Sequence, residues 1–235
     1  MVKTETNVIE KIPIKISEGE VLRYLGYQKK LSLNDSSHLH KVLKEELEQA
    51  YPLLESKGIY CFLTMISISR NGVIRTGQDY QFSVNKKIIN LIQNAEYLLF
   101  AVATVGAKIE EHTREWFKEG QYLKAMVWDA LGTVAVKTAG QWLNHFIEKE
   151  NIPRGFQLSR YFEPGSDDWD IQEQKKVFVI LQPEKIGVTL NSSCMMEPAK
   201  SLSWIRGMGQ NLTHSCRDEF SCDYCALPNC AFRKK

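Results

Sequence analysis

Apolar residues recur at two spacings along the chain, and these spacings predict both helices and strands. Three segments repeat apolar residues at helical spacing: residues 34–54, 108–118 and 122–148. Two segments are β-branched, aromatic or almost wholly apolar, and they predict strands: residues 59–68 and 97–104. Arg70-Asn71-Gly72 signals a turn, after which residues 73–84 return as a hairpin. Gly132 and Gly140 inside the longest helix suggest that another element packs closely there.

The second half of the chain has shorter elements. Residues 171–181 predict a helix, and residues 187–190 and 200–205 predict short strands. Residues 207–211 predict a flexible segment that leads out of the domain. Helices mixed with hairpin signals favour an α+β fold, with an antiparallel sheet and long helices, over a regular parallel α/β fold. We expect one domain over residues 1–211, followed by a cysteine-rich tail over residues 212–235.

Composition narrows the function classes. The 235 residues carry a formal net charge of +2, which predicts neither nucleic-acid binding nor membrane-surface attachment as a main activity. No apolar stretch has the length of a signal peptide or a membrane span, so we expect a cytoplasmic protein with no membrane partner. In that compartment the six cysteines are reduced, and they are read as ligands or redox groups before disulfides.

Residues 160–210 carry a set of short motifs whose order is more specific than any one of them. They include Pro164-Gly165, Asp168-Trp169, Gln174, Ile186-Gly187-Val188 with Leu190, Met196-Glu197-Pro198 and Lys200-Ser201. Upstream motifs belong to the same set: VLRYLGY at residues 21–27, Ala103-Thr104-Val105-Gly106 and Asp129-Ala130-Leu131-Gly132. Together they resemble the activation domain of cobalamin-dependent methionine synthase, and more closely the stand-alone proteins related to that domain. The resemblance covers nearly the whole chain except the tail.

The resemblance implies a fold and a chemistry. It implies an activation-domain-like fold and a module that binds S-adenosylmethionine beside a corrinoid carried by a partner, either a corrinoid-binding protein or a methyltransferase. In the family an electron donor reduces the cobalt, and methyl transfer from the sulfonium traps the reduced state. The cofactors carry out the electron and methyl transfer, and the protein positions them and provides charged groups around them. The chain would then be a methyltransferase component that supports reductive activation.

The resemblance also implies a ligand loop. Its candidate residues are Arg160, Tyr161, Glu163, Pro164, Gly165 and Ser166. The family typically has Arg-x-x-Pro-Gly-Tyr here, whereas this chain has Tyr161 in the place of the arginine and Ser166 in the place of the tyrosine. The family often has an acid about two turns after the Asp129 position, and this chain has Lys137. A lysine there would repel a sulfonium and an ammonium, with Glu163, Asp167 or Asp168 available to compensate.

Four cysteines gather in the tail. Cys216, Cys222, Cys225 and Cys230 give the spacing C-x5-C-x2-C-x4-C, and thiolates suit zinc or an iron–sulfur cluster. The spacing matches neither the ferredoxin run nor paired zinc knuckles, so both metals stay open, as does a redox dithiol. We favour an iron–sulfur cluster because reductive activation needs a low-potential electron. Cys61 and Cys194 are expected to be buried packing thiols.

Two other functions remain open at this point. The first is a metal-bearing adaptor or electron carrier that docks on a corrinoid protein without binding S-adenosylmethionine, favoured by Lys137, Ser166 and the tail. The second is an interaction subunit whose tail is stapled by zinc.

Overall fold

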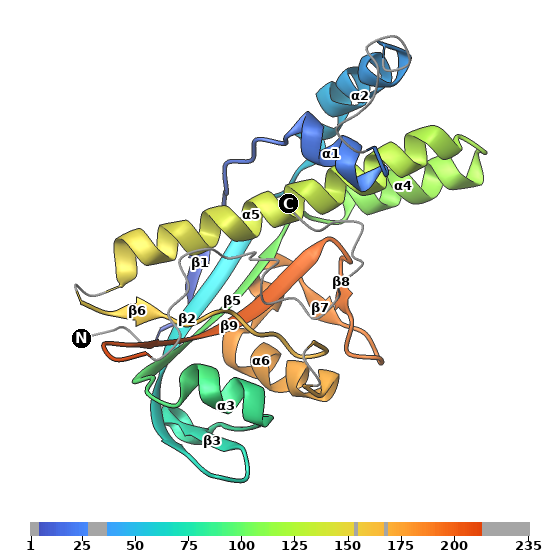
Figure 1. The fold of residues 1–235 in the computed structure, drawn as a ribbon. Coiled ribbons are helices and arrows are strands. Elements are labelled where there is room, and N and C mark those ends of the chain that lie inside the picture. Colours follow the sequence, from blue (N-terminus) through green and yellow to red (C-terminus); the bar gives the residue numbers. More distant parts are fainter. Residues whose placement is uncertain (1–4, 28–36, 153–154, 167–168, 213–235) are drawn as a thin grey trace.

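The computed structural model describes residues 5–27, 37–152, 155–166 and 169–212. A curled sheet of seven strands forms its centre, in the order β4-β3-β2-β5-β9-β6, with β1 also paired to β2 (Figure 1). These strands are β1 (Asn7–Ile9), β2 (Lys57–Ile68), β3 (Val73–Thr76), β4 (Gln81–Ser83), β5 (Tyr97–Thr104), β6 (Gln157–Leu158) and β9 (Ser201–Gly209). A separate pair is formed by β7 (Thr189–Leu190) and β8 (Met196–Glu197). Neighbouring strands are antiparallel throughout.

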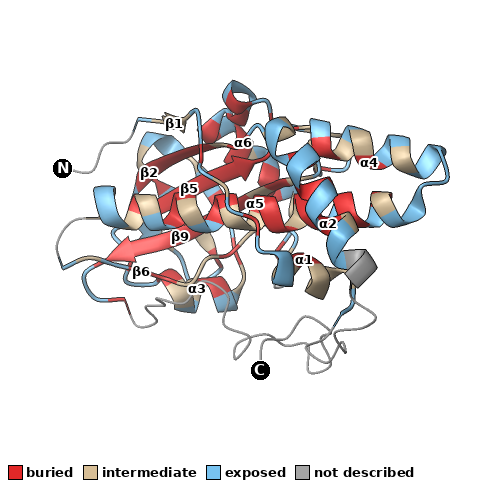
Figure 2. Cartoon of the chain, turned by 90° about the horizontal axis from the view of Figure 1, so that it is seen from above, coloured by how far each residue is buried: buried red, intermediate tan, exposed pale blue. Residues whose placement is uncertain are grey.

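Helices cover both faces of this sheet. They are α1 (Glu18–Tyr24), α2 (Ser37–Ala50), α3 (Lys86–Ile92), α4 (Lys108–Lys118), α5 (Tyr122–Asn151) and α6 (Gln174–Leu181). Short 3₁₀ turns lie at Tyr51–Leu53, Gly77–Asp79, Ile171–Glu173 and Pro183–Ile186. The long helix α5 crosses one face together with α1, α2 and α4, and α3 and α6 lie on the other (Figures 1 and 2).

The three central strands divide the core into two layers. Strand β5 pairs with β2 from Tyr97 to Thr104 and with β9 over the same length. Its alternate side chains point to opposite faces, so Leu99 and Ala101 join the layer under α5, and Leu98 and Phe100 join the layer under α6. Both layers are apolar, which explains why the β5 sequence is apolar at nearly every position.

The α+β class is confirmed, and most elements lie where the periodicity predicts them. Helix α4 and strand β5 have the predicted bounds, and α5 runs three residues beyond the predicted end, to Asn151. The expectation of a flexible exit at residues 207–211 is wrong at its start, because β9 continues to Gly209. A Cβ atom at Gly207 would lie 2.9 Å from Ile92 Cγ2, so this glycine permits the close packing of α3 on the strand. Strand β1 was not expected.

Two predictions concern the cysteine-rich tail and membrane spanning. The tail lies outside the described residues, beyond Leu212. Within them, no helix combines the length and the apolar character that crossing a bilayer requires.

Candidate functional site

The segment that follows β6 connects the two faces of the sheet. It runs beside β9, where Phe162 and Ile205 exchange two backbone hydrogen bonds of 2.9 and 2.8 Å. Because extended residues alternate in direction, Tyr161 packs in the α5 layer and Phe162 in the α6 layer. One short stretch therefore contributes to both cores.

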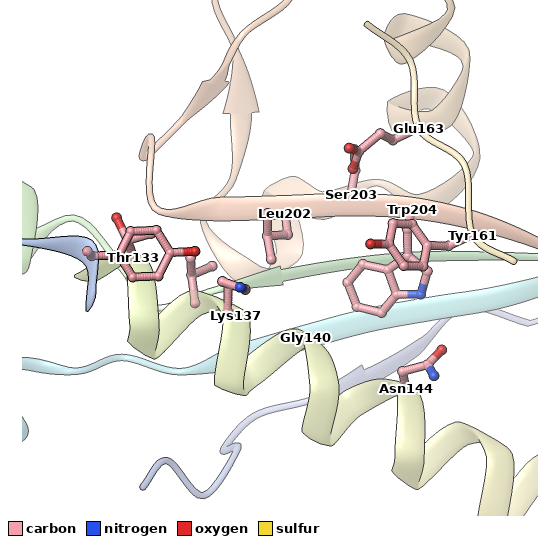
Figure 3. Close-up of a pocket in the computed structure, with 11 residues that line it drawn as sticks. Thr133, Lys137, Gly140, Asn144, Tyr161, Glu163, Leu202, Ser203 and Trp204 are labelled. Atoms are coloured by element: carbon pink, nitrogen blue, oxygen red, sulfur yellow. The ribbon is translucent and has the colours of Figure 1, made fainter. Parts of the chain in front are cut away.

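A cavity of about 300 Å³ lies between α5 and β9 (Figure 3). Its volume is at the lower end of the range for small-molecule pockets. The lining residues come from four segments: Tyr24 of α1; Thr133, Val136, Lys137, Gly140 and Asn144 of α5; Tyr161 and Glu163; and Leu202, Ser203 and Trp204 of β9. The α5 residues recur every three or four positions, so they form one stripe of the helix that faces the strand.

Charge is sparse in this cavity. Among the lining residues that the structure describes, Lys137 is the one basic side chain and Glu163 the one acidic side chain. Lys137 Nζ lies 5.4 Å from the centre of the Tyr24 ring, which is the geometry of a cation–π contact. The lysine thus lies in the cavity, held at its α1 side by an aromatic face.

Trp204 gives the cavity an aromatic wall. Its side chain is only 7% exposed, and its Nε1 has no hydrogen-bond partner among the residues that the structure describes. Helix α5 approaches this wall closely at Gly140, where a Cβ atom would lie at ordinary contact distances, 3.4 Å from Leu202 Cδ1 and 3.8 Å from Trp204 Cζ3. A buried donor without a partner costs about 1–3 kcal/mol.

A buried arginine fixes one end of the cavity. Arg206 is 1% exposed, and its Nε donates to the Ser159 carbonyl at 2.7 Å. Its Nη1 donates to Asn144 Oδ1 at 3.0 Å and to Glu148 Oε1 at 2.9 Å. A buried cation needs such partners, since an unpaired charge in a core is strongly destabilising. The network ties α5 to β9 and holds Asn144 in place.

The candidate residues from the ligand loop divide into two groups. Tyr161 and Glu163 line the cavity, whereas Arg160, Pro164, Gly165 and Ser166 are not among its lining residues. Pro164, Gly165 and Ser166 belong to a turn. In this turn Gly165 N–H donates to the Trp169 carbonyl at 2.9 Å, and Trp169 N–H donates to the Ser166 carbonyl at 2.9 Å. That turn packs through Trp169 on the α6 face. Ligand contact by these six residues stays a prediction.

Sequence reasoning missed several lining residues. Among them are Tyr24, Thr133, Asn144, Leu202, Ser203 and Trp204. Helical periodicity places Thr133 and Asn144 on the stripe of Lys137 and Gly140, so that signal was available. Nothing local connects Tyr24 with Lys137, because the α1–α5 packing joins distant parts of the chain.

The cysteines also divide into described and undescribed positions. Cys61 and Cys194 are buried, as expected, and burial raises the pKa of the Cys61 thiol to about 12. Such a thiol stays protonated and unreactive near neutral pH. Cys216, Cys222, Cys225 and Cys230 lie outside the described residues, and among the described ones no cluster of three metal-ligating side chains forms.

Comparison with known proteins supports the fold. No protein-family model matches the chain, and no curated protein does. Among solved structures it is similar to the crystal structure of the MetH reactivation domain bound to AdoHcy (S-adenosylhomocysteine). The TM-score is 0.58 at 13% sequence identity, over 87% of this chain and 78% of the other. At this identity the similarity shows the fold, which is that of the reactivation domain.

Proposed function

We propose that this chain is an activation-type module that binds S-adenosylmethionine in the cavity between α5 and β9. The observation that carries the proposal is this cavity of about 300 Å³, in a fold shared with a domain whose crystal structure contains AdoHcy. Bound S-adenosylmethionine would supply a methyl group to the reduced cobalt of a corrinoid held by a partner protein. AdoHcy is what remains of the donor after that transfer.

The lining residues fit such a ligand. Trp204 and Tyr161 offer aromatic surfaces for a purine. Glu163, the acidic lining residue, would face the sulfonium or the ammonium. The role of these residues would be to bind and orient the ligand while the apolar walls exclude water.

Calorimetric titration with S-adenosylmethionine and AdoHcy tests this proposal, with a matched pair of variants at Gly140. The added methyl group of Gly140→Ala meets Leu202 and Trp204 at ordinary contact distances, so we expect binding to persist. Gly140→Leu projects a larger group into the cavity, and we expect its affinity to fall at least about tenfold. Binding by neither ligand to the wild-type chain, with or without a corrinoid partner, contradicts the proposal.

We further propose that the cysteine tail holds a metal. Cys216, Cys222, Cys225 and Cys230 would bind an iron–sulfur cluster or zinc, the former serving as an electron relay to the cobalt. Anaerobic purification with an absorption spectrum and iron, sulfide and zinc assays distinguishes the two. A brown protein with iron and sulfide supports the relay, whereas a colourless protein with zinc makes the tail structural. A Cys222→Ser, Cys225→Ser variant with unchanged metal content contradicts both.

Lys137 favours a second candidate function. An ammonium group in the cavity disfavours a sulfonium ligand, which suits a metal-bearing adaptor that docks on a corrinoid protein without binding S-adenosylmethionine. Metal in the purified protein, association with a corrinoid partner and no calorimetric binding of either ligand would together select it.

A further inference from the structure

Three motifs that lie far apart in the sequence meet at one point of the fold. They come from the end of β5, from α5 and from the start of β9: Ala103–Gly106, Asp129–Gly132 and Lys200-Ser201. The Lys200 carbonyl accepts from Val105 N–H at 3.2 Å, and Ser201 Oγ donates to Thr104 Oγ1 at 2.9 Å. These bonds fix the backbone where β9 begins.

The Lys200 side chain joins this point to the long helix. Its Nζ donates to Asp129 Oδ1 at 2.7 Å and to Thr133 Oγ1 at 2.9 Å. Its stem lies across Gly132, where a Cβ atom would be 3.1 Å from Lys200 Cε and 3.2 Å from Lys200 Cγ. The glycine leaves the room that the stem occupies, and one side chain thereby ties the start of β9 to α5.

This tie lies at one end of the cavity. The α5 wall of the cavity begins at Thr133, the residue that Lys200 bonds, and continues through Gly140 (Figure 3). At Gly140 the helix approaches β9 directly, since a Cβ atom there would lie 3.4 Å from Leu202 Cδ1. The two glycines are about two helical turns apart. The Lys200 tie therefore holds one end of the stretch in which helix and strand have to stand apart to admit a ligand.

The Thr133 hydroxyl belongs to this tie. It donates to the Asp129 carbonyl at 2.9 Å and accepts from Lys200 Nζ. A hydroxyl has one proton to donate, so that proton is used within the helix. Thr133 thus contributes shape to the cavity, while its polar atom links the helix to the strand.

We propose that Lys200 is a positioning residue for ligand binding, which holds α5 at the distance from β9 that the cavity requires without touching the ligand. The proposal rests on the proposed function and deepens it. The ion pair is the smaller part of the tie, because Asp129 is 58% exposed and an exposed partner is screened by water. The bond to Thr133 and the packing of the stem on Gly132 supply the larger part.

Calorimetric titration with AdoHcy tests this role in variants that remove the tie in steps. Lys200→Met keeps an unbranched stem over Gly132 but loses both bonds, and we expect its affinity to fall about 5- to 20-fold. Thr133→Val keeps the shape of the wall and loses one bond, so its affinity should fall about three- to fivefold. Lys200→Arg restores a cationic donor, and we expect it to bind within about threefold of the wild-type chain.

A double variant separates positioning from a general loss of stability. If Lys200 and Thr133 act through their mutual bond, Lys200→Met combined with Thr133→Val should bind AdoHcy about as tightly as Lys200→Met alone. The matched control is Lys176→Met on the α6 face, which removes the ion pair of Lys176 with Glu173 at 2.8 Å. We expect this control to bind AdoHcy as the wild-type chain does.

The outcomes separate this proposal from the proposed function. If AdoHcy binds to Lys200→Met as tightly as to the wild-type chain, or if the double variant loses the product of the two single factors, the positioning role fails while the proposed function stands. An equal fall in Lys176→Met would also contradict the positioning role, since it would show a general loss of stability. If neither AdoHcy nor S-adenosylmethionine binds to the wild-type chain, both proposals fail.

Discussion

Both faces of the sheet bury tryptophan, and two of these residues, Trp169 and Trp204, differ in one hydrogen bond. Under α6, Trp169 is 4% exposed and its Nε1 donates to the Ser83 carbonyl at 2.6 Å. Under α5, Trp204 is 7% exposed and its Nε1 has no partner among the described residues. The Trp169 donor on the α6 face is thus satisfied, whereas the α5 face combines the cavity between α5 and β9 with an unsatisfied tryptophan donor. The two faces therefore differ at these two tryptophans, one with its donor satisfied and the other in the wall of a cavity.

The segment around residue 163 contributes side chains to both faces within a few residues. Tyr161 and Glu163 line the cavity, while the rings of Phe162 and Trp169 lie 5.5 Å apart, centre to centre, and tilted to each other in the α6 layer. Pro164 and Gly165 form the turn that lets the chain reach Trp169. The Pro-Gly pair, which the sequence predicts to be a ligand loop, is thus also explained by the packing that it permits.

Among the substitutions that test the difference between the two faces, the largest loss of stability is expected at Gly165. Its φ of +88° lies in the left-handed region, and a Cβ atom would lie 2.8 Å from Ile171 Cδ1. We expect Gly165→Ala to lower the free energy of unfolding by about 1–3 kcal/mol, from backbone strain plus the displacement of the end of the Ile171 side chain. Urea unfolding followed by tryptophan fluorescence measures this change.

Gly155 is the matched control for that variant. Its φ is +89°, and within the described part of the chain nothing lies within 4 Å of where a Cβ atom would stand, so Gly155→Ala carries the backbone strain alone, about 1–2 kcal/mol. Because the turn at Gly165 packs on the α6 face, Gly165→Ala should bind AdoHcy as the wild-type chain does while it stays folded. Equal losses of stability in both variants would show that Ile171 moves aside without cost, and a loss of AdoHcy binding in folded Gly165→Ala would show that the turn serves the cavity instead.

The sequence predicts the fold better than the cavity, and the reason is the range of the contacts involved. Helix α4 and strand β5 are set by local periodicity, so their bounds follow from the residues themselves. Strand β9 looks shorter in sequence than it is, because Gly207 reads as a breaker. A glycine stands at position 207 because Ile92 of α3 approaches the strand closely there, and no local sequence pattern contains that contact.

The candidate site depends on contacts of still longer range. The resemblance to a family points to Tyr161, Glu163 and Lys137, and the structure places all three in one cavity. Tyr24 and Trp204 join them only because α1 and β9 pack against α5, so their roles appear only when the chain is folded. The tail cysteines remain predictions from spacing and chemistry.

The smallest effect is expected from the two tryptophans themselves, and it measures the difference between the faces directly. Trp169→Phe and Trp204→Phe remove the same atoms from two buried sites, but only the first also loses a hydrogen bond, to the Ser83 carbonyl. We expect Trp169→Phe to lower the free energy of unfolding by about 1 kcal/mol more than Trp204→Phe does. Only Trp204→Phe should weaken AdoHcy binding, since Trp169 does not line the cavity. If urea unfolding finds equal losses and calorimetry finds unchanged binding, the two faces do not differ in the way that their hydrogen bonds indicate.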